Sequence, residues 1–195
     1  MQVTIVHRMT ELIRSLGHSC AVVGGIAICL RVRERLTKDI DLAVATRTDR
    51  EVEALVAPLR RAGFMLRTVL EQTDRGVIAT LRFALPGSSG PDLDLLCASC
   101  GIEREIVAGA EPIPLGGGKT LPVAKIPHLI AMKVLAESDH RAMDRADLLY
   151  LIQAATTQEL AEAEAALGLI ASRGFHRGKN LIGVLQSFRD RARPT

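Results

Sequence analysis

Aromatic residues are scarce in this sequence, which has no tryptophan, one tyrosine and four phenylalanines among its 195 residues. We therefore expect an aliphatic core and few exposed rings on which nucleic-acid bases could stack. Long hydrophobic runs are also absent, because none reaches the roughly 18 residues that a membrane-spanning helix requires. Charged residues interrupt the segment 1–17, so it lacks the continuous apolar stretch of a signal peptide. These absences predict a cytoplasmic protein with no membrane partner.

A strong excess of one charge is missing as well, since the formal net charge is only +3. So small an excess does not by itself select an acidic partner. Basic residues do collect between 173 and 193, where six of them occur. This stretch is either a solvated cationic helix or a contact for RNA, and the sequence leaves both interpretations open.

The four cysteines form no complete metal or redox motif. Cys97 and Cys100 make a single C-x-x-C pair, but a structural zinc site needs a second pair, and Cys20 and Cys29 lack that close spacing. In a reducing cytoplasm we expect all four to be thiols, and we expect Cys97 and Cys100 to pack as small buried or half-buried residues.

A second incomplete motif lies at residues 116–120 (GGGKT), which resemble the end of a phosphate-binding loop. The full motif needs an earlier glycine where this chain has Ile113, and a helix should follow the lysine, whereas Leu121-Pro122 follows here. We therefore expect a tight turn between two strands at this position.

What is present is a globular composition, 48% hydrophobic and 24% charged, with clear periodicity in its first two thirds. Apolar residues at helical spacing alternate with short β-prone segments, which is typical of an α/β arrangement. The predicted strands cover residues 19–23, 38–45, 64–71, 77–85 and 92–97, with two extended pieces and a glycine turn in 115–123. The predicted helices cover residues 4–16, 26–34, 48–62 and 102–108.

The character of the sequence changes after residue 123, because only helical patterns follow. They cover residues 126–138, 143–155, 157–172 and 179–191. We therefore predict an α/β (α+β) fold in which a small mixed β-sheet with flanking helices, residues 1–123, precedes a helical C-terminal lobe, residues 124–195. No linker composition separates the two lobes, so we expect them to share a core.

Two glycines and two aspartates stand out between residues 24 and 41. Gly24-Gly25 close a short predicted strand, a helix follows, and the next strand carries Asp39 and Asp41. Side chains at i and i+2 of a strand point to the same face, so the two carboxylates are expected to project together. Such close like charges are costly unless a cation lies between them, and Mg²⁺ suits a few carboxylates plus substrate phosphates. The glycines allow a phosphate chain to approach the backbone beside a helix N-terminus.

A third carboxylate is expected from the strand at 92–97. Asp94 lies mid-strand, directly before apolar residues, and we prefer it to Asp92 as the general base for an attacking hydroxyl and as ligand of a second metal. Asp92 shares the same strand face, so that alternative stays open. The sequence therefore predicts Asp39, Asp41 and Asp94 as the catalytic and metal-binding residues of a phosphoryl or nucleotidyl transfer.

Gly24-Gly25, thirteen intervening residues and then Asp39-Ile40-Asp41-Leu42 resemble the signature of the DNA polymerase β-like nucleotidyltransferase superfamily. Residues 121–151 are similar to the AbiEii/AbiGii toxin branch of that superfamily. There, a proline-containing helix start, a helical lysine and an R-x-x-D-x-x-D-L run follow the catalytic lobe. The matching positions are Lys133, Arg141, Asp144 and Asp147.

The resemblance implies that Asp39 and Asp41 bind Mg²⁺ and that the NTP contacts Gly24, Gly25, Lys133 and Asp144. Much of the superfamily has serine where this chain has Gly25, so one hydroxyl contact to a phosphate is missing. The implied reaction moves a nucleoside monophosphate from an NTP to a hydroxyl or phosphate of an acceptor. A tRNA end or a protein hydroxyl is the acceptor that the resemblance suggests, a small molecule stays open, and a cognate antitoxin is an implied partner.

Less specific interpretations exist for the same residues. Lys133 lies in an apolar helix, where a lysine also extends its charge to the surface. The residues around Asp144 also match an exposed helix start with i, i+3 pairs. At the level of the whole protein, the alternative is a catalytically quiet module that binds a nucleotide or a protein partner.

Overall fold

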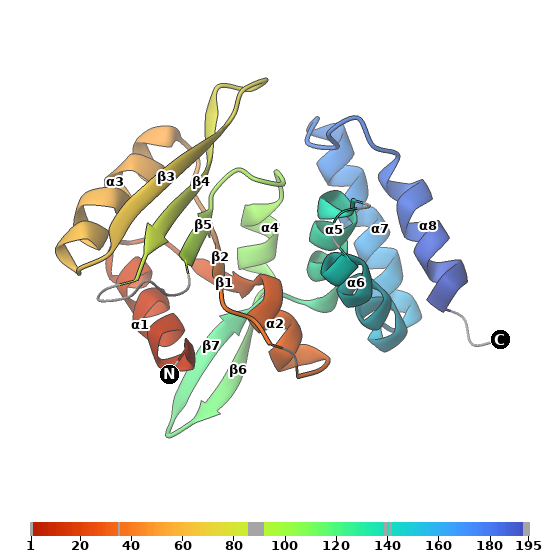
Figure 1. Cartoon of the computed structure of the whole chain (residues 1–195), viewed down its shortest axis with the longest axis horizontal. Helices are drawn as coiled ribbons and strands as arrows, with labels where there is room; N and C mark the ends of the chain where they lie inside the picture. The colour runs from red at the N-terminus through yellow and green to blue at the C-terminus, as the bar shows by residue number, and fades with distance from the viewer. Residues whose placement is uncertain (1, 35, 86–91, 139, 141, 193–195) are drawn as a thin grey trace.

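The computed structural model describes residues 2–34, 36–85, 92–138, 140 and 142–192. Within them, seven strands form one mixed sheet in the order β3-β4-β5-β2-β1-β7-β6 (Figure 1). β2 pairs in parallel with β5 and antiparallel with β1, while β4 pairs antiparallel with both β3 and β5. The strands are β1 (Cys20–Val23), β2 (Ile40–Val44), β3 (Met65–Gln72), β4 (Val77–Ala84), β5 (Asp92–Leu96), β6 (Glu111–Gly116) and β7 (Lys119–Val123).

The helices divide between the two sides of this sheet. Figure 1 shows α1 and α3 on one side, while α5 to α8 gather together on the other. The helices are α1 (Gln2–Ser15), α2 (Gly24–Arg31), α3 (Asp49–Arg61), α4 (Glu103–Ala108), α5 (Ile126–Ala136), α6 (Ala142–Ala154), α7 (Thr157–Ser172) and α8 (Leu181–Ala192). The predicted fold class, a small mixed sheet with flanking helices followed by a helical C-terminal part, is confirmed.

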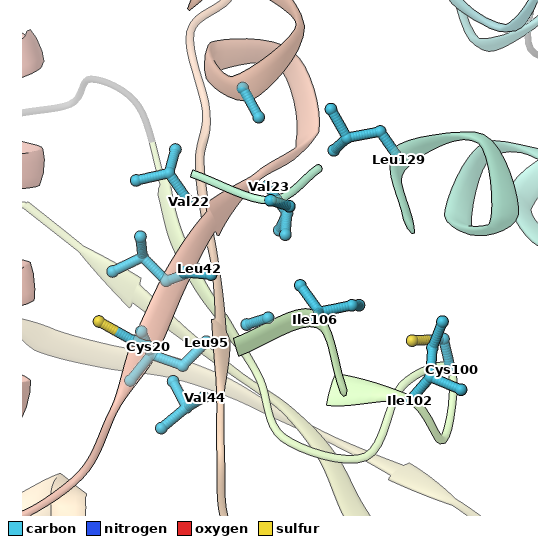
Figure 2. Close-up of a cluster of buried hydrophobic side chains, with 14 of the residues drawn as sticks. Cys20, Val22, Val23, Leu42, Val44, Leu95, Cys100, Ile102, Ile106 and Leu129 are labelled. Atoms are coloured by element: carbon cyan, nitrogen blue, oxygen red, sulfur yellow. The ribbon is translucent and has the colours of Figure 1, made fainter. Parts of the chain in front are cut away.

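The core is continuous between the sheet and the C-terminal helices. One cluster of buried apolar side chains runs from Val6 of α1 through the central strands to Phe188 of α8. Figure 2 shows part of it, with Val23 at the end of β1 and Leu129 of α5 among the same group of side chains. Most members are aliphatic, as the shortage of aromatic residues predicts. The boundary at residues 123 and 124 stays a prediction.

Several element boundaries differ from the sequence-based ones. The helix predicted to begin at residue 26 begins at Gly24 and ends at Arg31, so the glycine pair forms its first turn. The strand predicted from residue 38 begins at Ile40, so Asp39 lies just before it. The last helix begins at Leu181 rather than at residue 179. The predicted loop at 86–91 lies outside the described residues.

The two incomplete motifs have the structural roles expected of them. Residues 116–118 turn the chain from β6 into β7, and all three glycines have positive φ angles there. Cys97 and Cys100 are buried, and burial raises the pKa of the Cys97 thiol to about 12. All four cysteines are thiols rather than members of disulfide bonds. No helix in the described ranges combines the length and apolar character needed to cross a membrane.

Candidate active site

The sheet brings two of the predicted site residues, Asp41 and Asp94, onto neighbouring strands. Val23, the last residue of β1, lies opposite Asp41 of β2, and Asp41 lies beside Asp94 in the parallel β2–β5 pair. Arg82 of β4 lies opposite Asp94 in turn. A single row across four strands therefore contains two carboxylates and one guanidinium, with Asp39 exposed directly before β2.

Gly24 packs closely against the Asp41 side chain. Its φ angle is +62°, in the left-handed region that glycine adopts without steric cost. A Cβ atom at this position would overlap the Asp41 carboxylate, so no other residue fits without moving Asp41. Gly24 and the buried Gly25 are the first two residues of α2, whose opening N–H groups have no partner within the helix. Sequence pattern and geometry thus agree that backbone, carboxylate and helix N-terminus meet here.

The Asp41 carboxylate is strongly perturbed by its surroundings. Burial, followed by the negative charges of Asp94 and Asp39, raises the pKa of Asp41 to about 6, although Lys133 and Arg82 act in the opposite direction. The two nearby cations therefore do not offset the combined effect of burial and of the neighbouring negative charges on Asp41. A divalent cation with oxygen ligands would relieve this repulsion, so the donor set of Asp41 and its carboxylate neighbours suits such an ion.

Asp94 is held by Arg82, a residue that the sequence reasoning missed. The guanidinium donates from Nε to Oδ1 over 2.8 Å and from Nη2 to Oδ2 over 2.7 Å, a bidentate arrangement. Both oxygens of Asp94 accept from Arg82, so each of them faces a positive charge before any metal binds.

Among the described residues, no group of three or more His, Cys, Asp or Glu side chains is arranged as a ready-made metal site.

Asp92, the alternative third carboxylate, is placed differently from Asp94. It lies opposite Ala84 rather than beside Asp41, and it pairs with Arg67 of β3 at 3.2 Å. Its side chain is 30% exposed, against 13% for Asp94. Of the two carboxylates on β5, Asp94 is therefore the one adjacent to Asp41.

Lys133 approaches the site from α5, where it is paired rather than free. Its Nζ donates to Oδ1 of Asp144 and lies 2.9 Å from Oδ2 of the fully buried Asp147, both on α6. Arg33 lies near the same carboxylate, with its Nη2 3.9 Å from Oδ1 of Asp147. Its guanidinium carbon lies 3.8 Å from the centre of the Tyr150 ring. The surface-lysine interpretation of Lys133 does not fit a side chain that is only 11% exposed.

Arg141, which the resemblance also singled out, lies outside the described residues. Asp144 and Asp147 therefore represent the R-x-x-D-x-x-D-L run in the structure. They anchor the lysine between two carboxylates on successive turns of α6.

A pocket of about 320 Å³ lies between the sheet and the C-terminal helices. Four of the predicted site residues line it, namely Gly24, Asp41, Lys133 and Asp144, whereas Gly25, Asp39 and Asp94 are not among its lining residues. Its walls come from the β1–α2 junction, from β2, β4, β5 and the following loop, from α5 and α6, and from the loop between α7 and α8. The polar and charged members are Gly24, Asp41, Thr80, Ser99, Lys133, Asp144 and Arg177. Asp39 lines a neighbouring, more open hollow together with Asp144 and His140.

Arg82 and Arg177 are the site residues that sequence reasoning did not assign. A signal existed for Arg82, because it is the one charged residue within the apolar strand 77–84. Arg177 is one of the six basic residues between 173 and 193, and the sequence pattern does not place that stretch in the pocket. Its loop is more than 130 residues away from Asp41 in the chain, and no local pattern indicates that it returns to the pocket.

The sheet, the glycine at the helix start and the paired carboxylates together define a nucleotidyltransferase-like protein. The family model described as nucleotidyl transferase AbiEii toxin, type IV toxin–antitoxin system, matches residues 9–194. This chain therefore belongs to the AbiEii nucleotidyl transferase toxin family of enzymes. No curated protein matches the sequence.

Two solved structures share the fold over nearly the whole chain. An antigenic nucleotidyltransferase-like protein from Paracoccidioides brasiliensis has a TM-score of 0.52 and 19% identity, covering 94% of this chain and 91% of its own. The antibiotic-resistance factor ANT(2'')-Ia has a TM-score of 0.50 and 19% identity, covering 97% of this chain and 92% of its own. At these identities the likeness establishes the nucleotidyltransferase fold alone.

Proposed function

We propose that this enzyme is a Mg²⁺-dependent nucleotidyltransferase that moves a nucleoside monophosphate from an NTP to a hydroxyl or phosphate of a tRNA end or a protein. The observation that carries the proposal is the adjacency of Asp41 and Asp94 on parallel strands, with Gly24 pressed against Asp41. Family membership implies an NTP substrate and a cognate antitoxin. Nucleotidyltransferases typically use a divalent metal, and the identity of that metal as Mg²⁺ is part of the proposal.

In the proposed reaction, the α-phosphoryl group of the NTP moves to the acceptor together with its nucleoside. An acceptor oxygen attacks the α-phosphorus of the NTP, a new P–O bond forms, and the bond to the β-phosphate oxygen breaks to release pyrophosphate. Asp94 takes the proton of the attacking hydroxyl, and Arg82 orients both oxygens of that carboxylate. Mg²⁺ held by Asp39 and Asp41 would neutralise charge on the phosphates.

The remaining site residues bind the triphosphate. The first N–H groups of α2, at Gly24 and Gly25, offer donors to phosphate oxygens, and the missing serine hydroxyl leaves this contact to the backbone. Lys133 supplies a point charge from α5. It exchanges part of its pairing with Asp144 and Asp147 for the triphosphate, so Asp144 acts on the nucleotide through this lysine.

Incubating the protein with α-³²P-labelled NTPs, Mg²⁺ and a cell extract tests the proposal. The parent protein should label an acceptor, and a folded Asp41→Asn variant should lose on the order of three decades of transfer. Digestion of the product with ribonuclease or with protease then distinguishes a tRNA acceptor from a protein acceptor. Near-normal transfer by folded Asp41→Asn would remove Asp41 from the site, and an unlabelled extract would contradict the transfer reaction.

A further inference from the structure

Among the residues that the structure describes, Arg177 is the pocket-lining cation that has no carboxylate partner. Within the described residues, each of the other cations near the site has an anionic partner: Lys133 has Asp144, and Arg82 has Asp94. The Arg177 side chain makes one hydrogen bond within the described residues, of 3.0 Å from Nη2 to the carbonyl oxygen of Ser99. A guanidinium carries five N–H donors, so this contact leaves most of them available.

The backbone at Arg177 has an unusual conformation. Its φ angle is +53°, and among the described residues it is the only non-glycine residue in the left-handed region. Such a conformation costs free energy and persists where the surroundings impose it, often at a binding site. Gly178, the next residue, would adopt it without that cost, and it also has a positive φ of +72°. An arginine thus occupies a backbone position that suits glycine better.

The surroundings do fix this loop in place. On one side of Arg177, the Arg173 guanidinium donates to the carbonyl of Gly101 at 2.6 Å and pairs with Glu105. On the other side, Nζ of Lys179 donates to the carbonyl of Leu135 at 2.9 Å, at the end of α5. The α7–α8 loop is therefore tied both to the loop that follows β5 and to the helix that carries Lys133.

A third tie joins the same loop to the sheet. Phe175 packs so closely on Gly101 that a Cβ there would overlap the ring, and Arg75 of the β3–β4 turn lies 4.1 Å above that ring. The partner of Arg177 is fixed as well, because the buried Glu103 carboxylate accepts from Ser99 N and Cys100 N. Arg177 is thus held at the pocket wall by contacts on both of its flanks and at its own hydrogen-bond acceptor.

We infer that Arg177 binds the triphosphate of the NTP from the pocket wall formed by the α7–α8 loop, together with Lys133 of α5. This inference rests on the proposed function, because it names a further residue for the same substrate. A planar guanidinium donates two parallel hydrogen bonds to a phosphate, which the ammonium of Lys133 cannot do. The opening of α2 at Gly24 lines the same pocket, so an anion there meets positive groups from both parts of the chain.

Calorimetry with two Mg²⁺-bound ligands tests this inference. One ligand is inorganic tripolyphosphate, and the other is whichever of the four common NTPs binds the parent protein most tightly. The Arg177→Gly variant should weaken the binding of both ligands by about tenfold or more, because a charge-assisted contact is lost. Arg177→Lys should lie between this variant and the parent. Arg191→Ala removes the same charge from α8 outside the pocket and should stay within about twofold of the parent.

Thermal melting without ligand separates binding from folding. Glycine adopts the positive φ at position 177 without backbone strain, so Arg177→Gly should melt no lower than the parent while it binds more weakly.

Unchanged affinity of Arg177→Gly for both ligands would overturn the inference and leave the proposed function intact. Weakened NTP binding with unchanged tripolyphosphate binding would also overturn it, since the contact would then be to base or sugar. A parent protein that binds neither ligand would overturn the proposed function and this inference with it.

Discussion

Asp94 and Arg82 face each other across the antiparallel β4–β5 pair and are joined by two hydrogen bonds of 2.7 and 2.8 Å. The Asp94 side chain is 13% exposed and the Arg82 side chain 41% exposed, so the carboxylate is the more enclosed partner. The arrangement fixes the orientation of Asp94 directly beside Asp41. The proposed general base is therefore held in place before any substrate arrives.

The first prediction concerns this pair. Arg82→Gln leaves Asp94 without its guanidinium and close to the Asp41 charge, so the free energy of unfolding should fall by about 1–2 kcal/mol. Asp94→Asn in the same background should recover part of that loss, because the unpaired negative charge is then gone. Urea unfolding of the two single variants and the double variant measures this coupling. Strictly additive losses would mean that the two side chains do not stabilise each other.

The second prediction concerns Gly24. Gly24→Ala should lower nucleotidyl transfer by more than tenfold, because its Cβ displaces the Asp41 carboxylate. Gly17→Ala is the matched control: Gly17 also has a positive φ, +83°, but nothing lies within 4 Å of an added Cβ. Both variants should lose about 1–2 kcal/mol of stability through backbone strain. Only Gly24→Ala should lose activity, and equal activity of the two variants would contradict the close fit at Asp41.

The third prediction follows from the raised pKa of Asp41, about 6 against an ordinary value of 3.8. Between these values the folded protein binds a proton more tightly than the unfolded chain does, so stability without metal falls as pH rises through about 4–6. Asp41→Asn cannot titrate. Its stability relative to the parent should therefore rise by on the order of 2–3 kcal/mol between pH 4 and pH 7.

Urea unfolding in EDTA at several pH values checks the sign of this effect. Parallel pH profiles for the parent and Asp41→Asn would show that Asp41 is not perturbed. Adding Mg²⁺ at pH 7 should stabilise the parent and leave Asp41→Asn nearly unchanged, because only the ionised carboxylate binds the cation well.

The local part of the site could be predicted from the sequence, and the long-range part could not. The Gly24 turn and the Asp39 and Asp41 carboxylates lie within one β–α–β stretch, where short-range periodicity and turn chemistry are informative. The adjacency of Asp41 and Asp94 depends on a parallel pairing between strands that are separated in the chain by α3, β3 and β4. A third acidic strand was expected, but its register was not.

Arg82 and Arg177 show why the long-range part of the site could not be predicted from the sequence. Arg82 meets Asp94 only because the antiparallel register of β4 and β5 aligns them. Arg177 reaches Ser99, 78 residues away, only because the α7–α8 loop docks on the loop after β5. Such docking results from packing between helices and sheet, and no spacing in the sequence encodes it. Element ends, such as the start of β2 at Ile40, differ from the predicted ones by a few residues, because helix and strand ends are weakly specified.

The fourth prediction concerns Lys133. Lys133→Met removes the ammonium that lies 2.9 Å from the buried Asp147 carboxylate, so it should cost about 3 kcal/mol of stability as well as NTP affinity. The double variant Lys133→Met/Asp147→Asn should recover stability without recovering NTP affinity. Denaturant unfolding and calorimetry with Mg²⁺–NTP separate the two effects. If the double variant binds NTP as the parent does, Lys133 stabilises the fold and has no role in binding the triphosphate.

The most direct test of the proposed reaction compares the two carboxylates of β5. Asp94 adjoins Asp41, whereas Asp92 lies opposite Ala84 and pairs with Arg67. Transfer of α-³²P-labelled NTP to RNA and protein in a cell extract should be abolished in Asp94→Asn, which should still bind Mg²⁺–NTP, because Mg²⁺ accepts one or two carboxylates plus phosphate oxygens. Asp92→Asn should transfer label at a rate close to that of the parent. Full transfer by Asp94→Asn together with loss of transfer by Asp92→Asn would contradict the assignment of Asp94 as the general base.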